Sequence, residues 1–440
     1  MDKTARSKND KQETRRLQQL LLPFLGALSS MRVTLLDLVF RIGFTGITTL
    51  LEQERTMLVG TRYKHNAKRA YTRAGHDQEG ELVLGGRKVK FPRPRVRTVN
   101  DANGKSVEVP LEAWEAFSKE DPLTERALEQ MLVGVTTRKY ARSLEDLPNE
   151  ISSHSTSKSS VSRRFVEATT DTLATLMSAS IAELDIYALM LDGKVVGGHT
   201  VIAALGIDRE GNKHPLGVWE GATENAEVCK SLLTNLVERG LPTNRSLLFV
   251  IDGGKAIAKA VRDVFGKRAL IQRCQVHKRR NVLEHLPEVQ RTSVGATIST
   301  AYRCRDPERA LQLLKKLARY LEKKHPGAAA SLREGMEETL TVLRIGLPET
   351  LERILASTNI IENLNGTMKR VSRNVKNWQD GTMALRWFAA AMAEAQKGFR
   401  RLKGYQGMKI LIAALRAHDD AIDGRNEKST AGLAQVMKAA

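Results

Sequence analysis

The sequence has few cysteines and no long apolar run. Only three cysteines occur among 440 residues, Cys229, Cys274 and Cys304. This is too few for a disulfide framework and indicates a reducing cytosol. The most apolar early stretch, residues 17–31, contains Pro23 and is soon followed by charged residues, so it is too short for a membrane span. No apolar segment of a secretory signal follows the polar N-terminus. We therefore expect an intracellular protein.

Negative charge is also scarce relative to positive charge. Lys and Arg number 70 against 50 Asp and Glu, which gives a net charge of +20 and a pI near 9.9. Such an excess favours a polyanionic partner. Hydrophobic residues make up 41% and charged residues 27%, as in soluble globular proteins, and the length predicts about two to four domains. Ribosomal or histone-like chains rarely carry enough apolar sequence for several cores, so composition favours an enzyme that acts on nucleic acid.

The N-terminal part divides into a helical region, residues 1–57, and a basic β-rich module, residues 58–110. In the first, Leu17, Leu20, Leu21 and Phe24 share one helical face. In the second, glycines and prolines separate short alternating runs that predict hairpins. Because the basic residues alternate with apolar ones, they fall on one strand face and could contact phosphates. A solvated basic face is the alternative. The candidate DNA contacts are Arg62, Arg69, Arg87, Lys88, Arg93, Arg95 and Arg97.

Residues 111–180 predict a helix-turn-helix-like DNA-binding region. A short helix is expected near Gly134–Ala141, and a recognition helix near Ser157–Thr169 follows a Ser/Thr-rich run. Ser, Lys and Arg in its first turns are the residue types that touch phosphates and base edges. A flexible linker is the other interpretation of this run. The candidate contacts are Lys158, Ser159, Arg163 and Arg164.

The central part, residues 181–280, predicts a mixed sheet in the order β-β-β-α-β-α-β. The expected strands are Tyr187–Leu191, Thr200–Ile207, His214–Trp219, Leu247–Ile251 and Ala269–Gln272, and the expected helices are Asn225–Gly240 and Lys255–Phe265. The continuous apolar run at 247–251 is typical of a strand buried on both faces. Residues 281–355 predict only helices, among them 328–344 and 348–355, and thus a helical insertion. Residues 356–440 would complete the core.

Three carboxylates stand out by position. Asp192 directly follows the first expected strand, Asp252 follows the central one, and Glu362 opens the last long helical region. A charge beside buried neighbours needs a partner, and a divalent cation is a natural one. A single strand-end Asp more often caps a turn, but two of them with a helical Glu favour two Mg²⁺ or Mn²⁺ ions for phosphodiester chemistry. Glu220 or Glu224 is the alternative third acid.

Two further motifs lie near these acids. Cys274 and His277 have the spacing of half a zinc site, yet no second pair lies nearby in the sequence, and a buried Cys with a capping His is the plain alternative. Lys255 follows two glycines but lacks the other residues of a nucleotide-triphosphate loop. Basic residues next to Glu362 favour phosphate contact over a solvated face. These are Lys369, Arg370 and Arg373.

Five motifs in order resemble the Mutator-type bacterial insertion-sequence transposases. They are Asp192-Gly193, the run from Lys213 to Asn225, the turn Asp252-Gly253-Gly254-Lys255-Ala256, Arg273-Cys274-Gln275-Val276-His277-Lys278, and Ser357-Thr358-Asn359-Ile360-Ile361-Glu362. The resemblance implies an α/β ribonuclease-H-like mixed sheet core, interrupted by an all-helical insertion, with an N-terminal β-hairpin and helical DNA-binding region. The interval between Asp252 and Glu362 is long enough to contain that insertion.

The resemblance also implies a chemistry. Asp192, Asp252 and Glu362 would ligate two Mg²⁺ or Mn²⁺ ions, and His277 would approach the scissile phosphate or order a carboxylate. Hydrolysis would free a 3′-OH at the element's end, and transesterification would join it to target DNA. The expected partners are double-stranded terminal inverted repeats and a second copy of the chain, in a dimer or higher oligomer near the bacterial nucleoid. A nuclease or resolvase, or a non-catalytic DNA-binding regulator, are the alternatives.

Overall fold

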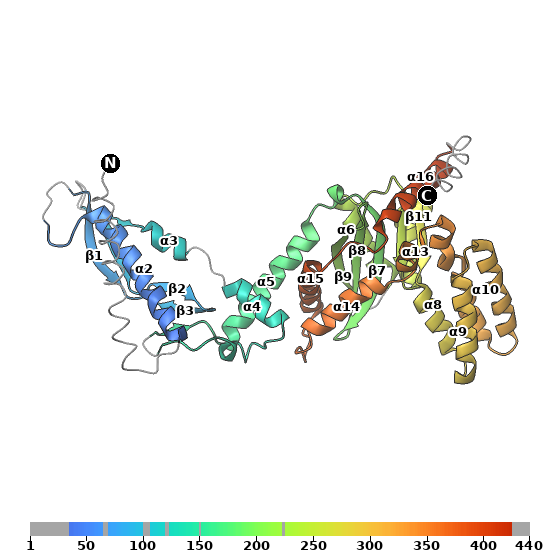
Figure 1. Ribbon diagram of the computed structural model, residues 1–440, viewed down its shortest axis with the longest axis horizontal. Coiled ribbons are helices and arrows are strands. Elements are labelled where there is room, and N and C mark those ends of the chain that lie inside the picture. The colour runs from blue at the N-terminus through green and yellow to red at the C-terminus, as the bar shows by residue number, and fades with distance from the viewer. Residues whose placement is uncertain are drawn as a thin grey trace, which may run out of the picture. The chain divides into compact units, whose positions relative to one another are not determined.

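The computed structural model describes residues 35–64, 69–99, 106–118, 123–148, 151–221 and 225–424. The predicted helical face with Leu17 and Phe24 lies outside these residues. Contacts divide the chain into unit 1, Met1–Gln130 with Val135–Phe165, and unit 2, Met131–Gly134 with Val166–Ala440 (Figure 1). Within the described ranges, no helix combines the length and the apolar character needed to cross a membrane.

Unit 1 combines helices with two small sheets. Its elements are α2 (Leu35–Val59), β1 (Tyr71–Asp77), β2 (Glu81–Leu84), β3 (Arg87–Lys90), β4 (Arg93–Thr98), β5 (Glu108–Val109), α3 (Glu112–Ser118), α4 (Leu123–Leu132), β6 (Ser153–His154) and the start of α5 (Lys158–Ser178). The sheets have the orders β1-β4-β5 and β2-β3-β6. β2 and β3 pair antiparallel around Gly85 and Gly86, whose positive φ angles favour glycine. Leu51, Val89, Phe91 and Val96 are fully buried between α2 and the strands.

Two sequence expectations for this region were wrong. Gly134–Ala141 forms turns, and the helical structure after it is only a short 3₁₀ helix at Ala141–Ser143. The expected recognition helix begins near its predicted start but runs on to Ser178. Its second half belongs to unit 2, where the sulfur of Met177 accepts a hydrogen bond from the Val218 N–H. Packing on the sheet therefore extends the helix beyond its polar N-terminal turns.

Unit 2 contains the predicted mixed sheet. Its strands are β7 (Ile186–Val196), β8 (His199–Asp208), β9 (Lys213–Gly221), β10 (Leu247–Ile251) and β11 (Ala269–Arg273). They lie in the order β11-β10-β7-β8-β9, with β7, β8 and β9 antiparallel, and with β10 parallel to both β7 and β11. Helices α6 (Ala226–Glu238) and α7 (Lys255–Phe265) pack on this sheet. The element order, the mixed character and the fully buried strand at 247–251 are confirmed.

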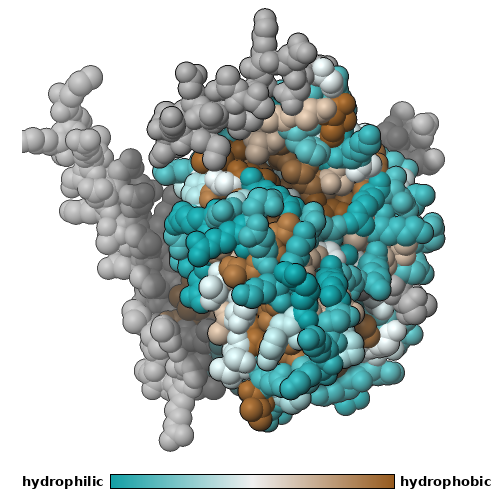
Figure 2. All heavy atoms as spheres, turned by 90° about the vertical axis from the view of Figure 1, so that its right-hand side faces the viewer, coloured by the Kyte–Doolittle hydropathy of each residue, from teal (hydrophilic) through white to brown (hydrophobic). Residues whose placement is uncertain are grey.

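The described part of the region after β11 contains helices and no strand, as predicted. It consists of α8 (Gln275–Glu284), α9 (Glu288–Tyr302), α10 (Pro307–Glu322), α11 (Pro326–Arg333), α12 (Thr341–Ile345) and α13 (Glu349–Leu355). These helices have their own core, which includes Ile298, Leu314 and Leu321. Viewed from the side where α9 and α10 lie in Figure 1, the surface is mostly hydrophilic (Figure 2). The single helix expected over 328–344 was wrong, because the chain turns at Gly335, which has φ +58°.

Three C-terminal helices return to the sheet. They are α14 (Asn359–Val371), α15 (Gly381–Lys397) and α16 (Met408–Ile422). α14 packs on β7 and α15 on β9. α16 is fastened to the start of β10 by Asp419, which accepts hydrogen bonds from the Ser246 N–H and from Arg268. The chain therefore leaves the sheet after β11, builds the helical insertion, and returns with α14 beside the strand that carries Asp192.

Candidate active site

Asp192 and Asp252 lie at the same level on adjacent strands. In the parallel pair of β7 and β10, Leu191 is opposite Ile251, so the next residue along each chain segment is an aspartate, Asp192 within β7 and Asp252 directly after β10. The prediction that Asp192 directly follows its strand was wrong, since β7 continues to Val196. The apolar run ends at Leu191 because β10 ends there. Beyond that level β7 pairs only with β8, and its side chains become more exposed.

Asp252 begins a tight turn into α7. Its Oδ1 accepts a hydrogen bond from the Gly254 N–H at 2.9 Å, which fixes the direction of the carboxylate. Gly253 has φ +116°, a conformation that strongly favours glycine. The carbonyl oxygen of Gly253 accepts a hydrogen bond from Arg273 Nη1 at 3.1 Å. The end of the neighbouring strand β11 thus holds the turn that carries Asp252.

Glu362 lies in the first turn of α14, which confirms its predicted place on a helix. The residue at the N-terminal cap position of this helix is Thr358, and its side chain makes no capping bond to the backbone. The buried Thr358 hydroxyl instead donates to Glu362 Oε1 at 2.7 Å and lies 3.2 Å from His277 Nδ1. Thr358 therefore orients the Glu362 carboxylate. Sequence reasoning did not single it out.

Cys274 and His277 connect α8 to α14. The buried Cys274 Sγ accepts hydrogen bonds from the backbone N–H groups of His277, at 3.5 Å, and Thr358, at 3.4 Å. Burial alone would raise the pKa of the Cys274 thiol, but hydrogen bonds with the side chains of His277 and Thr358, together with these backbone bonds, lower it. The hydrogen bond between the two side chains also raises the pKa of His277. His277 Nδ1 lies 3.8 Å from Glu362 Oε1, a position suited to ordering that carboxylate.

The negative charges interact most strongly at Asp192. Its side chain is almost fully buried, with a residue exposure of 7%. The pKa of Asp192 is raised to about 6, by burial first and then by the charges of Asp252 and Glu362, whereas His277 and a hydrogen bond from Asn365 act in the opposite direction. That bond joins Asn365 Nδ2 to Asp192 Oδ2 over 2.5 Å. The site gathers more negative charge than the side chains around it neutralise.

The carboxylates of Asp192, Asp252 and Glu362 nevertheless do not form a cluster tight enough to enclose a single ion. Among the described residues, the group whose ligand atoms all lie within 4.8 Å of one another is Cys274, His277 and Glu362. The sulfur in this group is buried and already accepts two hydrogen bonds. The carboxylates of Asp192, Asp252 and Glu362 are hard oxygen ligands of the kind that Mg²⁺ and Mn²⁺ prefer.

The alternative third acids are less favourable. Glu220 lies on β9, which is separated from β7 by β8, and its Oε1 is 2.9 Å from His199 Nδ1. It is not among the charges that shift the pKa of Asp192. Glu224 lies outside the described residues. Glu362 is thus the helical acid that the structure brings to Asp192.

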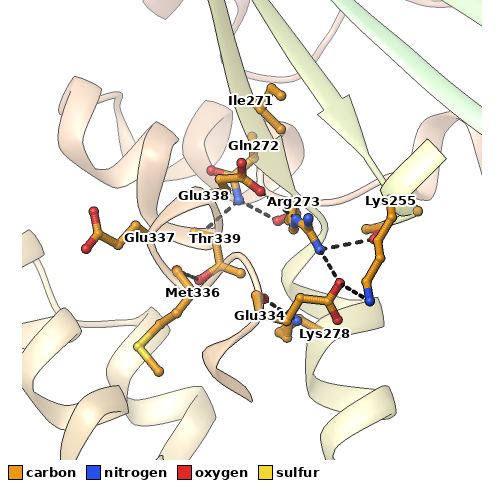
Figure 3. A network of polar contacts seen from close by, with 12 residues as sticks. Lys255, Ile271, Gln272, Arg273, Lys278, Glu334, Met336, Glu337, Glu338 and Thr339 are labelled. Atoms are coloured by element: carbon orange, nitrogen blue, oxygen red, sulfur yellow. Dashed lines mark hydrogen bonds and ion pairs between the residues drawn. The ribbon is translucent and has the colours of Figure 1, made fainter. Parts of the chain in front are cut away.

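A polar network fastens the insertion to the turn that carries Asp252 (Figure 3). The buried Arg273 donates through Nε to Glu338 Oε2 at 2.5 Å, besides its bond to Gly253. Lys278, 5% exposed, donates to the carbonyl oxygens of Ser331, in the last turn of α11, and Glu334, just after it, at 2.7 and 2.6 Å. Burial lowers the pKa of Lys278 to about 8. The insertion is therefore joined to the strand end beside Asp252 and is not a freely hanging appendage.

The predicted DNA contacts fall into two groups. Some cations are already engaged by neighbours within the chain: Arg93 and Arg95 with Glu108, Lys88 with Glu81, Arg87 with the Glu145 carbonyl, Arg164 with the Ser155 carbonyl, and Arg373 with the Val133 carbonyl. The other candidate residues are exposed on the surface: Arg62, Arg69, Arg97, Lys158, Ser159, Arg163, Lys369 and Arg370. The exposed group is the better source of phosphate contacts.

Comparison with known proteins relates this chain to transposases. The family described as "Transposase, Mutator family" matches residues 29–401. The chain is 30% identical over 312 residues to the transposase for insertion sequence element ISRM5 of Rhizobium meliloti (strain 1021), covering 68% of this chain and 75% of that protein. It is 26% identical over 366 residues to the transposase for IS256 in transposon Tn4001 of Staphylococcus aureus, covering 80% and 88%.

A further relative matches over a shorter region. The transposase for insertion sequence element ISRM3 of Rhizobium meliloti (strain 1021) is 29% identical over 211 residues, and the matched region spans 52% of its length. The family match spans most of the chain, including both aspartates, the insertion and Glu362. The protein belongs to the Mutator family of transposases.

Proposed function

We propose that this protein is a DDE transposase that binds the terminal inverted repeats of an insertion sequence and catalyses metal-dependent strand cleavage and strand transfer. The observation that carries the proposal is the convergence of three acids, one on β7, one directly after the adjacent parallel strand β10 and one on a returning helix, where the buried Asp192 faces uncompensated negative charge. The sheet order β11-β10-β7-β8-β9, with one antiparallel half, supports a ribonuclease-H-like classification of the core.

The residues fit two Mg²⁺ or Mn²⁺ ions held by Asp192, Asp252 and Glu362. When bound, such ions activate a water or a 3′-OH and stabilise the leaving oxygen of an in-line displacement. The chain's own groups hold the ligands: the Gly254 N–H fixes Asp252, and Thr358 and His277 orient Glu362. The His277 side chain, 14% exposed, stays in contact with that carboxylate and can reach a phosphate only at its remaining ring edge.

Exposed cations in both units supply the means to hold DNA. Lys369 and Arg370 follow Glu362 on α14 and are exposed, while Lys158 and Arg163 are exposed at the start of α5. Cations of this kind neutralise phosphates and release counterions on binding. Strand transfer at two element ends calls for at least two active sites, so the proposal includes a dimer or a higher oligomer of this chain on DNA.

Incubation of the full-length chain with labelled duplex carrying the element's own ends, a plasmid target and Mg²⁺ tests the function. A transposase is expected to give end-labelled DNA joined to the plasmid. Cleaved ends without joined product would indicate a nuclease or resolvase, and a gel shift alone would indicate a regulator. Scrambled ends serve as the DNA control, and Asp192→Asn as the protein control.

Salt dependence should separate the exposed cations from the paired ones. Arg95 and Arg97 lie two residues apart on β4, but Arg95 donates to Glu108 at 2.6 Å whereas Arg97 is exposed. Removing one phosphate-binding cation should reduce the slope of log K against log salt by about 0.9. We expect Arg97→Gln to lower the slope by about this amount and Arg95→Gln to change it much less, as measured by fluorescence anisotropy on end DNA. Equal effects of the two variants would contradict the assignment.

A further inference from the structure

The helix that carries Glu362 brings a second polar side chain to the site. Asn365 lies three residues after Glu362 on α14, so both side chains point from the same helical face. Its amide nitrogen crosses to β7 and donates to Asp192 Oδ2 at 2.5 Å. One short segment of α14 therefore supplies one acid of the triad and a direct contact to another.

The other half of the Asn365 amide lacks a partner. Its Oδ1 is buried from solvent and accepts no hydrogen bond from any part of the chain that the structure describes. Rotating the amide would not remove the problem, because the oxygen would then face the Asp192 carboxylate and the NH₂ group would lose its acceptor. A buried acceptor without a donor is costly and uncommon in native proteins. A donor that only the working site provides would explain it.

We propose that Asn365 is a positioning residue of the metal site. Its NH₂ group holds the Asp192 carboxylate in the orientation that ligates the divalent ion, and its Oδ1 accepts a hydrogen bond from a water molecule in the ion's coordination shell. Mg²⁺ and Mn²⁺ sites retain several such waters, and groups that orient ligands in this way commonly change metal affinity 10–100-fold when removed. This inference rests on the proposed function, because it assumes that Asp192 ligates the ion.

Mn²⁺ binding to the DNA-free, full-length protein tests the inference without relying on activity. We expect Asn365→Ala to raise the dissociation constant for Mn²⁺, measured by titration calorimetry, by about 10–100-fold. Asn363→Ala is the matched control, since Asn363 is the same residue type on the same helix but is exposed. It should bind Mn²⁺ within about twofold of the wild-type protein. The melting temperature of each variant in EDTA separates an effect on the metal from an effect on the fold.

The affinity and the melting temperature together decide the role of Asn365. Weakened Mn²⁺ binding with an unchanged melting temperature in EDTA supports the positioning role. Wild-type Mn²⁺ affinity in Asn365→Ala, while Asp192→Asn and Glu362→Gln lose binding, would overturn the inference and leave the proposed function intact. A lowered melting temperature with unchanged affinity would likewise overturn it and assign Asn365 a purely structural contact. Undiminished binding in the triad variants themselves would instead contradict the proposed metal site.

Discussion

Asp192→Asn, Asp252→Asn and Glu362→Gln should each reduce strand cleavage on the order of 10³-fold or more, in the full-length chain with Mg²⁺. Each change is nearly isosteric and, under the proposed function, removes one negative ligand from the metal site. DNA binding should be retained, because the exposed cations of unit 1 and of α14 are untouched and less negative charge faces the phosphates. Gel-based cleavage assays and anisotropy on the same DNA measure the two properties separately.

Two other acids provide the controls. Glu220→Gln tests the competing assignment of the third acid, and Asp263→Asn removes an exposed carboxylate from α7. Both variants should cleave at close to the wild-type rate. Near wild-type cleavage in Asp192→Asn, Asp252→Asn or Glu362→Gln would remove that residue from the triad, and loss of cleavage in Glu220→Gln would reopen the choice of third acid.

The sequence predicted elements best where burial on both faces leaves an unbroken apolar run. Strand Leu247–Ile251 and helix Lys255–Phe265 have the predicted bounds, since the Asp252-Gly253-Gly254 turn separates them sharply. The strand was expected to end before Asp192 for the opposite reason, because burial decreases beyond this position while β7 continues. The antiparallel ribbon of β7 and β8 extends past the sheet core, where polar side chains are tolerated and look like a turn in the sequence.

The missed site residues depend on contacts between distant segments. Thr358 and Asn365 reach His277 and Asp192 only because α14 packs on β7 after the long insertion. The break at Gly335 has a similar origin, since a Cβ there would collide with the guanidinium of Arg273 from β11. No local pattern encodes these encounters. The spacing of Glu362 and Asn365 on one helical face was the one available signal, and it identifies a shared face without naming the partner.

Asp192→Asn should also stabilise the metal-free protein at neutral pH. The pKa of Asp192 is raised from 3.8 to about 6, by burial first and then by Asp252 and Glu362. The folded state therefore binds the proton more tightly than the unfolded state, so stability falls as pH rises from about 4 through 6 and stays low above it. The rise in pKa corresponds to at most about 3 kcal/mol at pH 7.5.

Urea unfolding in EDTA at pH 7.5 and pH 4 measures this effect. We expect Asp192→Asn to exceed the wild-type protein in unfolding free energy by about 1–3 kcal/mol at pH 7.5, with the difference shrinking at pH 4, where Asp192 is protonated in the fold. Asp263→Asn should show no such gain. Mn²⁺ should stabilise the wild-type chain and not the variant, because binding to the folded state adds stability by mass action. A variant less stable than wild type at pH 7.5 in EDTA would contradict the idea that the buried, charged Asp192 destabilises the metal-free fold and that a cation would offset this cost.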